Sequence, residues 1–388
     1  MGLFSKKEKP VNGMMGVDIG AGGIKMTELR KDGGRMRLLT YAYSVFPNGG
    51  GETTILDDPK RAGGIIKDMM KQAGMKSTRT NASLPSHSVF HTIITIPIPK
   101  SAKTNLKPII EAQVQKYLPL PLDEMILDSE IIDKEKLPKP VLIEKKKDKK
   151  KVEQKKLVEK KAPPKESDVG HVRVLVSGAP RVLVAKYVEV FKQTKLQLIS
   201  LETEVFALIR SLIGKDRSRV MIVDIGFERT NITIVDRGIP YLHRSIKAGG
   251  DHVTQMLAKQ MGLSHAEAEQ SKLDLALTPT REGNIPPVLQ EALSPIMHEV
   301  KYSLELYAQQ SFHDNNTVEK IILTGGSAQL PYIDSLLAKA LDMNVYVGDP
   351  WARIATPKGL RPVLDEIGPR FSVSVGLGMK DLEEKKKK

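Results

Sequence analysis

The feature that most constrains this chain of 388 residues is a short segment that occurs twice. Met15-Gly-Val-Asp-Ile-Gly-Ala-Gly-Gly-Ile-Lys-Met-Thr27 resembles Met221-Ile-Val-Asp-Ile-Gly-Phe-Glu-Arg-Thr-Asn-Ile-Thr233, at a constant offset of 206 residues. Each copy reads as an apolar strand with an Asp near its end, a turn that contains glycine, and a second apolar strand. The repeat predicts two related halves, each built around one β-hairpin.

The residue types in these hairpins suit a phosphate site. A glycine turn lets backbone N–H groups approach a phosphate closely, and an Asp at a strand end can hold Mg²⁺ directly or through water. Two hairpins facing each other across a cleft would clamp the phosphates of one nucleotide from both sides. The alternative is a pair of unrelated hairpins. The residues that correspond between the copies are Asp18 and Asp224, Gly20 and Gly226, and Lys25 and Asn231.

A third element follows in the stretch 318–331. It reads as an apolar strand, then Thr324-Gly325-Gly326, then the start of a helix. Paired glycines let a nucleoside lie against the backbone, and a helix N-terminus favours anionic groups. The chain contains neither GxxxxGK[ST] nor GxGxxG, so the motifs of P-loop and Rossmann proteins are absent from it.

The net charge of +14 is concentrated in three segments. Residues 134–165 carry +9, and residues 1–9 and 380–388 carry +2 each. A nucleic-acid-binding domain would show this charge on a folded face, often with interleaved aromatic residues, yet only 5% of the chain is aromatic. We therefore expect no specific nucleic-acid partner. Solvated segments and attraction to an anionic membrane surface are the two remaining interpretations.

Several classes are excluded by composition. The chain has no cysteine, which excludes disulfide scaffolds, zinc–cysteine sites, iron–sulfur clusters and thiol catalysis. The eight histidines show no HExxH spacing, and we expect His87 and His91 to be surface residues of a strand. No apolar run is long enough to span a membrane, and the N-terminus lacks the apolar core of a signal peptide. A soluble cytoplasmic protein is expected.

Residues 134–168, rich in Lys and Pro, read as an insertion. Both flanks, 125–132 and 171–177, are strand-like, which predicts one strand connection with a greatly lengthened loop. Elsewhere strands and helices alternate, and the pattern is typical of an α/β fold with mixed sheets. The expected helices cover residues 58–74, 104–118, 180–194, 202–213, 264–273 and 294–311.

These elements, in this order, resemble the actin/Hsp70/sugar-kinase superfamily. The whole chain resembles more specifically the PilM family, the actin-like (FtsA-like) proteins of type IV pilus assembly at the inner membrane. The segments that carry the resemblance are 16–20, 111–124 (Glu-Ala-Gln-Val-Gln-Lys-Tyr-Leu-Pro-Leu-Pro-Leu-Asp-Glu), 202–208, 223–226, 262–269, 323–326 and 371–378.

The resemblance implies an actin-like ATPase fold: two lobes with related sheets around a nucleotide cleft, plus an inserted subdomain of the FtsA type. The implied domains are a flexible N-terminus (1–12), a first lobe (13–97, 196–217 and 365–380), the small subdomain (98–195, with the 134–168 loop disordered), a second lobe (218–364) and a basic tail (381–388).

The resemblance also implies ATP and Mg²⁺ as cofactors. The implied nucleotide-binding residues are Asp18, Gly20 and Lys25 in the first hairpin, Asp224, Gly226, Thr230 and Asn231 in the second, Gly325 and Gly326 at the adenosine, and Glu269 and Lys272 at the ribose. Asp18 and Asp224 are the implied metal-binding residues. An ordinary surface ion pair is the alternative for Glu269 and Lys272.

The chain departs from the family pattern in both turns. Ala21, Gly22 and Gly23 stand where relatives often have hydroxyl residues, and the second turn reads Phe227-Glu228-Arg229. Glu228 would repel a triphosphate, whereas Arg229 would attract it. No residue is assigned to position an attacking water, so the catalytic residues stay unknown. We expect ATP binding with weak or no ATPase activity.

The implied partner is an inner-membrane protein of the PilN type, bound through its N-terminal cytoplasmic peptide. Peripheral association with the inner face of the cytoplasmic membrane and formation of a homo-oligomer are expected as well. The alternatives are an FtsA-like division filament protein and a small-molecule kinase of the superfamily. The end of the chain, 381–388, lacks the apolar stripe that a division protein uses as its membrane helix.

Overall fold

The computed structural model describes residues 13–46, 55–98, 101, 104–133, 170–277, 286–310, 317–330 and 332–382. The predictions for the N-terminus, for the Lys-rich insertion at 134–168 and for most of the basic tail lie outside these residues. The chain divides into two compact units. The large unit comprises residues 1–89 and 181–388, and the small unit runs from Phe90 to Pro180.

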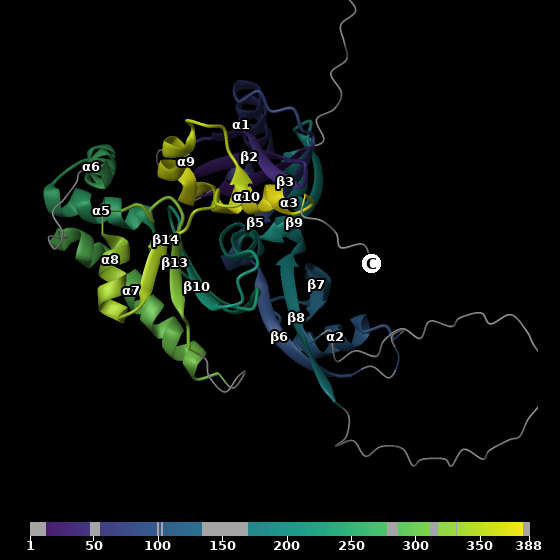
Figure 1. The fold of residues 1–388 in the computed structure, drawn as a ribbon. Coiled ribbons are helices and arrows are strands. Elements are labelled where there is room, and N and C mark those ends of the chain that lie inside the picture. The colour runs from purple at the N-terminus through teal and green to yellow at the C-terminus, as the bar shows by residue number, and fades with distance from the viewer. Residues whose placement is uncertain are drawn as a thin grey trace, which may run out of the picture. The chain divides into compact units, whose positions relative to one another are not determined.

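The large unit contains a six-stranded sheet, whose strands come from distant parts of the chain (Figure 1). The spatial order is β15-β3-β2-β1-β5-β9. The strands are β1 (Gly13–Gly20), β2 (Gly23–Asp32), β3 (Arg35–Tyr43), β5 (Arg79–Leu84), β9 (Gln197–Thr203) and β15 (Ile354–Ala355).

A second sheet of the large unit has five strands in the order β12-β11-β10-β13-β14. Its strands are β10 (Arg219–Ile225), β11 (Thr230–Asp236), β12 (Ile239–Ile246), β13 (Lys320–Thr324) and β14 (Asn344–Val347). Both sheets mix parallel and antiparallel pairs, as the sequence predicts. In each sheet the first strand of a hairpin also pairs in parallel with a later strand, β1 with β5 and β10 with β13.

Both predicted hairpins are confirmed. In the first, Asp18 lies opposite Lys25 and a two-residue turn joins Gly20 to Gly23. In the second, Asp224 lies opposite Asn231 across a four-residue turn, which the Gly226 N–H closes by donating to the Arg229 carbonyl at 2.9 Å. The two turns therefore differ in length, although the strands on either side correspond.

Helices bury the faces of both sheets. In the first sheet, β1 is buried from Gly13 to Ile19, as expected for a strand covered on both faces. On the second sheet, α5 (Gly250–Met261), α6 (His265–Leu277), α7 (Pro287–Ala308) and α8 (Ile333–Leu341) contribute to one apolar core. A separate core joins its other face to α4 (Glu204–Leu208), to a π-helical segment (Ile209–Ile213) and to α10 (Ser372–Met379).

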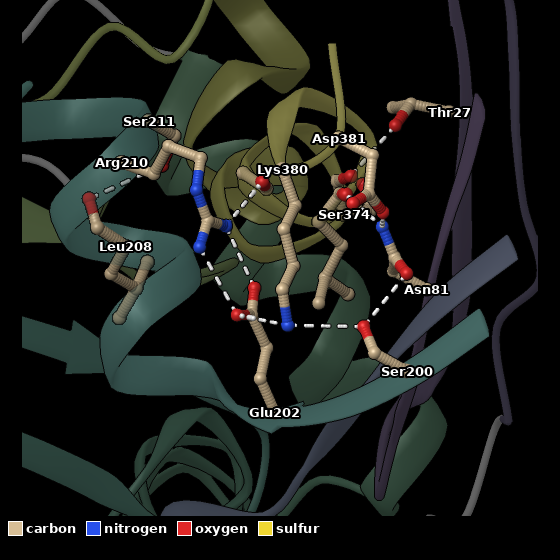
Figure 2. Close-up of polar contacts among 12 residues, drawn as sticks. Thr27, Asn81, Ser200, Glu202, Leu208, Arg210, Ser211, Ser374, Lys380 and Asp381 are labelled. Carbon is tan, nitrogen blue, oxygen red and sulfur yellow. Dashed lines mark hydrogen bonds and ion pairs between the residues drawn. The ribbon is translucent and has the colours of Figure 1, made fainter. Parts of the chain in front are cut away.

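Figure 2 shows the polar network that holds the end of α10. Arg210 donates to both carboxylate oxygens of Glu202, at 2.7 and 3.1 Å, and to the carbonyl oxygen of Gly376 at 2.7 Å. Lys380 bonds Glu202 and the Ser200 hydroxyl, each at 3.0 Å. These bonds satisfy a carboxylate whose side chain is only 9% exposed.

Most predicted helices form, with shifted ends. The helix α1 (Pro59–Gln72) begins as expected, because the Asp58 carboxylate accepts a hydrogen bond from the Arg61 N–H at 3.0 Å. The helix expected over 202–213 starts two residues late, because β9 continues to Thr203, and its second half is π-helical. The helix expected over 104–118 is shorter: α2 (Lys107–Val114) is followed by a 3₁₀ turn.

The other helices also differ mainly at their ends. The helix α3 (Arg181–Lys192) lies within the expected span, and α6 extends four residues beyond the expected end at Leu273. The helix α7 begins at Pro287, seven residues before the expected start, and contains Pro295 in its interior, at the ninth position. A short α9 (Arg361–Ile367) precedes α10. These differences arise because tertiary packing decides where a marginal helix end is retained.

The small unit has a three-stranded antiparallel sheet in the order β6-β8-β7, with α2 packed against it. The strands are β6 (Phe90–Pro97), β7 (Met125–Ile131) and β8 (His171–Pro180). The pairing of β7 with β8 confirms the predicted strand connection around the insertion. Next to that connection, Asp133 accepts hydrogen bonds from the Arg173 guanidinium, the shortest at 2.9 Å.

The unit boundaries, 90 and 180, differ from the subdomain expected over 98–195. Residues 90–97 pair with β8 of the small unit, and α3 packs against α1 of the large unit instead. His91, expected at the surface, is partly buried in β6, with Nδ1 3.0 Å from the Ser177 hydroxyl. Within the described residues, no helix is both long and apolar enough to cross a membrane.

Candidate functional site

The strand ends of both hairpins bring Asp18, Asp224 and Lys25 together. Asp18 is 7% exposed and accepts a hydrogen bond from the Ser83 hydroxyl at 2.8 Å. Burial raises the pKa of Asp18, and the charge of Lys25 opposes that shift. Burial raises the pKa of Asp224 to about 7, with a further contribution from Asp18 and an opposing one from Lys25. The two carboxyl groups and the ammonium group therefore interact, although they come from different sheets.

Glu204 is a member of this cluster that the sequence did not assign. It is the first residue of α4, and its Oε2 accepts hydrogen bonds from the Ser86 N–H at 2.9 Å and from Asn231 Nδ2 at 3.4 Å. Burial raises the pKa of Glu204 to about 8, and Asp18 and Asp224 add to the shift. The only sequence signal was its place in the 202–208 segment, which carries the family resemblance but shows no chemistry.

Within the second hairpin, the Thr230 hydroxyl is hydrogen-bonded to the protein backbone. It is fully buried and donates to the carbonyl oxygen of Ala248 at 2.6 Å, so it braces the hairpin from behind. Asn231 has an unused hydrogen-bond acceptor, because its Oδ1 is buried and has no hydrogen-bond partner among the described residues. Arg229 donates to the Ser245 hydroxyl at 3.3 Å.

The third predicted element meets the second hairpin directly. Gly325 has φ +88°, and a Cβ placed there would lie 2.4 Å from the carbonyl oxygen of Ile225 and 2.5 Å from Oδ1 of Asp224. Gly326 is exposed, and a Cβ there would have no heavy atom within 4 Å. Gly325 is therefore needed for close packing, whereas Gly326 borders open space.

A further glycine pair, Gly249-Gly250, belongs to the site and was missed. The Gly250 N–H donates to the Gly226 carbonyl and the Asp251 N–H to the Phe227 carbonyl, each at 2.9 Å. The N-terminus of α5 is thus capped by the second hairpin turn. A Gly-Gly pair before an amphipathic helix was the signal that could have revealed it.

Glu269 and Lys272 are not an ordinary surface pair. Lys272 is 6% exposed, and its ammonium donates to Glu269 Oε2 at 2.6 Å, the Thr254 hydroxyl at 2.9 Å and the Gly250 carbonyl at 3.1 Å. All three donors of the ammonium are used, so Lys272 braces the Gly250 corner. The Glu269 side chain is 34% exposed and can accept another hydrogen bond.

The donor set fits a hydrated Mg²⁺ rather than a metal held by protein ligands alone. Among the described residues, no group of three or more His, Asp and Glu side chains could hold a metal ion. The site instead offers two carboxyl groups, Asp18 and Asp224, together with the unpartnered amide oxygen of Asn231. Mg²⁺ usually keeps several waters and binds through one or two carboxylates plus phosphate oxygens, so these oxygens suit it.

Comparisons with known proteins identify the family and the fold of the chain. The family model described as "Type IV pilus assembly protein PilM" matches residues 16–161 and 151–382. Among solved structures, a PilM–PilN type IV pilus biogenesis complex is similar to the chain at 23% identity, covers 97% of this chain and 100% of its own, and has a TM-score of 0.75.

Two further structures share the fold. The ethanolamine utilization protein EutJ from Carboxydothermus hydrogenoformans is 15% identical, with 96% of this chain and 91% of its own covered, at a TM-score of 0.53. MreB5 of Spiroplasma citri bound to ADP is 13% identical, with 97% of each chain covered, at a TM-score of 0.50. These likenesses confirm the predicted actin-like fold. Because the family model spans most of the sequence, the chain belongs to the PilM family of type IV pilus assembly proteins.

Proposed function

We propose that this chain is an ATP-binding actin-like scaffold of the type IV pilus inner-membrane assembly complex. The observation that carries the proposal is the meeting of two glycine turns and two glycine pairs around Asp18 and Asp224. Backbone corners of this kind receive phosphates, and the similar MreB5 structure holds ADP. The corners lie at 20–23, 226–229, 249–250 and 325–326.

Each group has a distinct task in this proposal. Lys25 lies where its charge acts on both carboxyl groups, and it would attract the negative phosphates as well. Asp18 and Asp224 would hold Mg²⁺, which when bound neutralises phosphate charge. The adenosine would lie against the open face of Gly326. Glu269 would accept a hydrogen bond from a ribose hydroxyl, while Lys272 keeps the Gly250 corner in place.

We expect slow or absent ATP turnover. No residue of the chain is assigned to position an attacking water, which hydrolysis with general-base help would require. The role we propose is one in which the bound nucleotide sets the conformation offered to partners.

The proposed partner is the N-terminal cytoplasmic peptide of a PilN-type inner-membrane protein. The support is the similarity to a PilM–PilN complex across 97% of this chain, together with membership of the family. Such binding would place the protein at the inner face of the cytoplasmic membrane. A homo-oligomer stays a prediction, and no observation favours the division-filament or kinase alternatives over the pilus scaffold.

The test is Mg-ATP binding measured by isothermal titration calorimetry on the wild type and on Asp224→Ala. We expect the substitution to abolish measurable affinity. The matched control is Asp216→Ala, because Asp216 is a surface residue of the same unit that bonds Lys320 outside the cluster. Unchanged affinity in Asp224→Ala would contradict the site. A PilN-type N-terminal peptide, titrated separately by fluorescence anisotropy, tests the partner.

A further inference from the structure

The two hairpin turns touch each other through one side chain. A Cβ placed on Gly22, in the first turn, would lie 2.7 Å from Cβ, 3.1 Å from Cγ and 3.4 Å from Cδ2 of Phe227, in the second turn. The Phe227 side chain therefore packs against the backbone of Gly22, which has no side chain. Groups this close leave no room between them for a phosphate oxygen.

The first turn is held in place by hydrogen bonds. Behind it, the segment that follows β3 (Arg35–Tyr43) forms a second layer of backbone bonds. The Phe46 N–H donates to the Gly22 carbonyl at 3.1 Å, and the Ser44 N–H donates to the Ile24 carbonyl at 2.9 Å. In return, the Ile24 N–H donates to the Ser44 hydroxyl at 3.1 Å. Gly22 cannot retreat from a bulky neighbour without breaking these bonds.

The second turn is held just as firmly from its own side. The Phe227 carbonyl accepts the Asp251 N–H at the start of α5, and the neighbouring Gly226 carbonyl accepts the Gly250 N–H. The Gly250 corner is in turn bonded by Lys272. Two hydrogen bonds therefore connect the turn that carries Phe227 to the start of α5, where the Gly250 corner that we assign to the nucleotide lies.

Only the second turn presents a large side chain at this contact. The first turn has two residues, Ala21 and Gly22, and the second has four, from Gly226 to Arg229. An aromatic side chain between two phosphate-type turns contributes no hydrogen bond to a phosphate, so its contribution is apolar contact.

We propose that Phe227 is a latch that joins the two hairpin turns by packing against Gly22. The contact links the hairpin turns of the two sheets of the large unit. Phe227 must leave Gly22 before phosphates can lie between the turns, and this second statement rests on the proposed nucleotide binding. A nucleotide that displaces the ring would act on α5 through the Phe227 carbonyl.

The latch can be tested without any nucleotide. The chain has no cysteine, so spin labels can be attached at Lys67→Cys on α1 and Lys259→Cys on α5, both exposed. Double electron–electron resonance then gives the distance distribution between the labels in the ligand-free protein. We expect Phe227→Ala to broaden that distribution or to move it to longer distances. Tyr302→Ala, an exposed aromatic residue of α7, is the control and should change neither.

A double-mutant cycle makes the geometry specific. Gly22→Ala should broaden the distribution in the wild type and in Phe227→Ala, because the Cβ of residue 227 remains in the way. The same change should have no effect in Phe227→Gly, where that atom is gone. Circular dichroism confirms that each variant is folded. Distributions that stay the same in Phe227→Ala, or a Gly22→Ala effect that persists in Phe227→Gly, would overturn the latch.

Access of the nucleotide is measured separately, by stopped-flow fluorescence with a methylanthraniloyl derivative of ATP. We expect Phe227→Ala to raise the association rate constant several-fold, with Tyr302→Ala unchanged. Equal rate constants for Phe227→Ala and the wild type would overturn the role in access. If the probe binds to neither protein, the proposed nucleotide function fails, and the distance measurements alone decide whether Phe227 joins the turns.

Discussion

Two adjacent glycines give opposite predictions for the same substitution. Gly325 has a left-handed backbone, which costs an alanine about 1–2 kcal/mol, and the added Cβ would collide with Ile225 O and Asp224 Oδ1. Overpacking of this kind typically costs about 1–3 kcal/mol more. We therefore expect Gly325→Ala to lower the free energy of unfolding of the large unit by about 3 kcal/mol.

Gly326→Ala is the matched variant. Its Cβ would enter open space, and no positive φ stands in its way, so the free energy of unfolding should change by no more than about 0.5 kcal/mol. That open space is where we place adenosine. The added methyl group should therefore weaken Mg-ATP binding about tenfold, which corresponds to about 1.4 kcal/mol.

The assay uses the single tryptophan of the chain. Trp351 is fully buried in the large unit, so its fluorescence during urea unfolding reports on that unit specifically. Calorimetry on the same samples gives the affinity for Mg-ATP. Equal losses of stability in both variants would refute the packing argument. Full retention of affinity in Gly326→Ala would refute the placement of adenosine.

Three further predictions concern other parts of the chain. Burial lowers the pKa of His91 from its ordinary 6.5 to about 4. Between pH 6.5 and pH 4 the unfolded state therefore binds more protons than the folded state. The free energy of unfolding should fall as the pH drops through this range, by at most about 3 kcal/mol. Hydrogen exchange in β6 and β8 should show this slope in the wild type and in His171→Gln, at an exposed residue of β8, but not in His91→Gln. Arg210→Met leaves Glu202 buried with less compensation and should cost about 3 kcal/mol in urea unfolding, whereas a change below about 1 kcal/mol would contradict the network in Figure 2. Lys272→Met should speed hydrogen exchange at the first turn of α5 and weaken Mg-ATP binding, and unchanged exchange there would show that Lys272 does not brace the corner.

Local patterns were sufficient for the elements whose contacts are local. Each hairpin forms between residues adjacent in sequence, so apolar strands flanking a glycine turn predict the pairing, and the register confirms it. The cap of α1 at Asp58 is local in the same sense. The repeat, its charged residues and the family resemblance all follow from segments of this kind.

Unit boundaries required long-range information. Residues 90–97 have the strand pattern expected for either sheet, and pairing with β8, some 80 residues later, assigns them to the small unit. The start of α4 at Glu204 likewise depends on how far β9 continues beside β5. The residues of a strand do not indicate which distant strand it pairs with.

The features of the site also separate into those predicted from the sequence and those that depend on tertiary contacts. The sequence by itself determined the two hairpins, the identity of Asp18 and Asp224, and the glycine pair at 325–326. Only the tertiary structure decided that Glu204 joins the carboxyl groups and that Phe227 rests on Gly22. The physical reason is that a pKa depends on burial and on charges nearby in space, and a steric contact depends on separations of a few ångströms between segments about 200 residues apart.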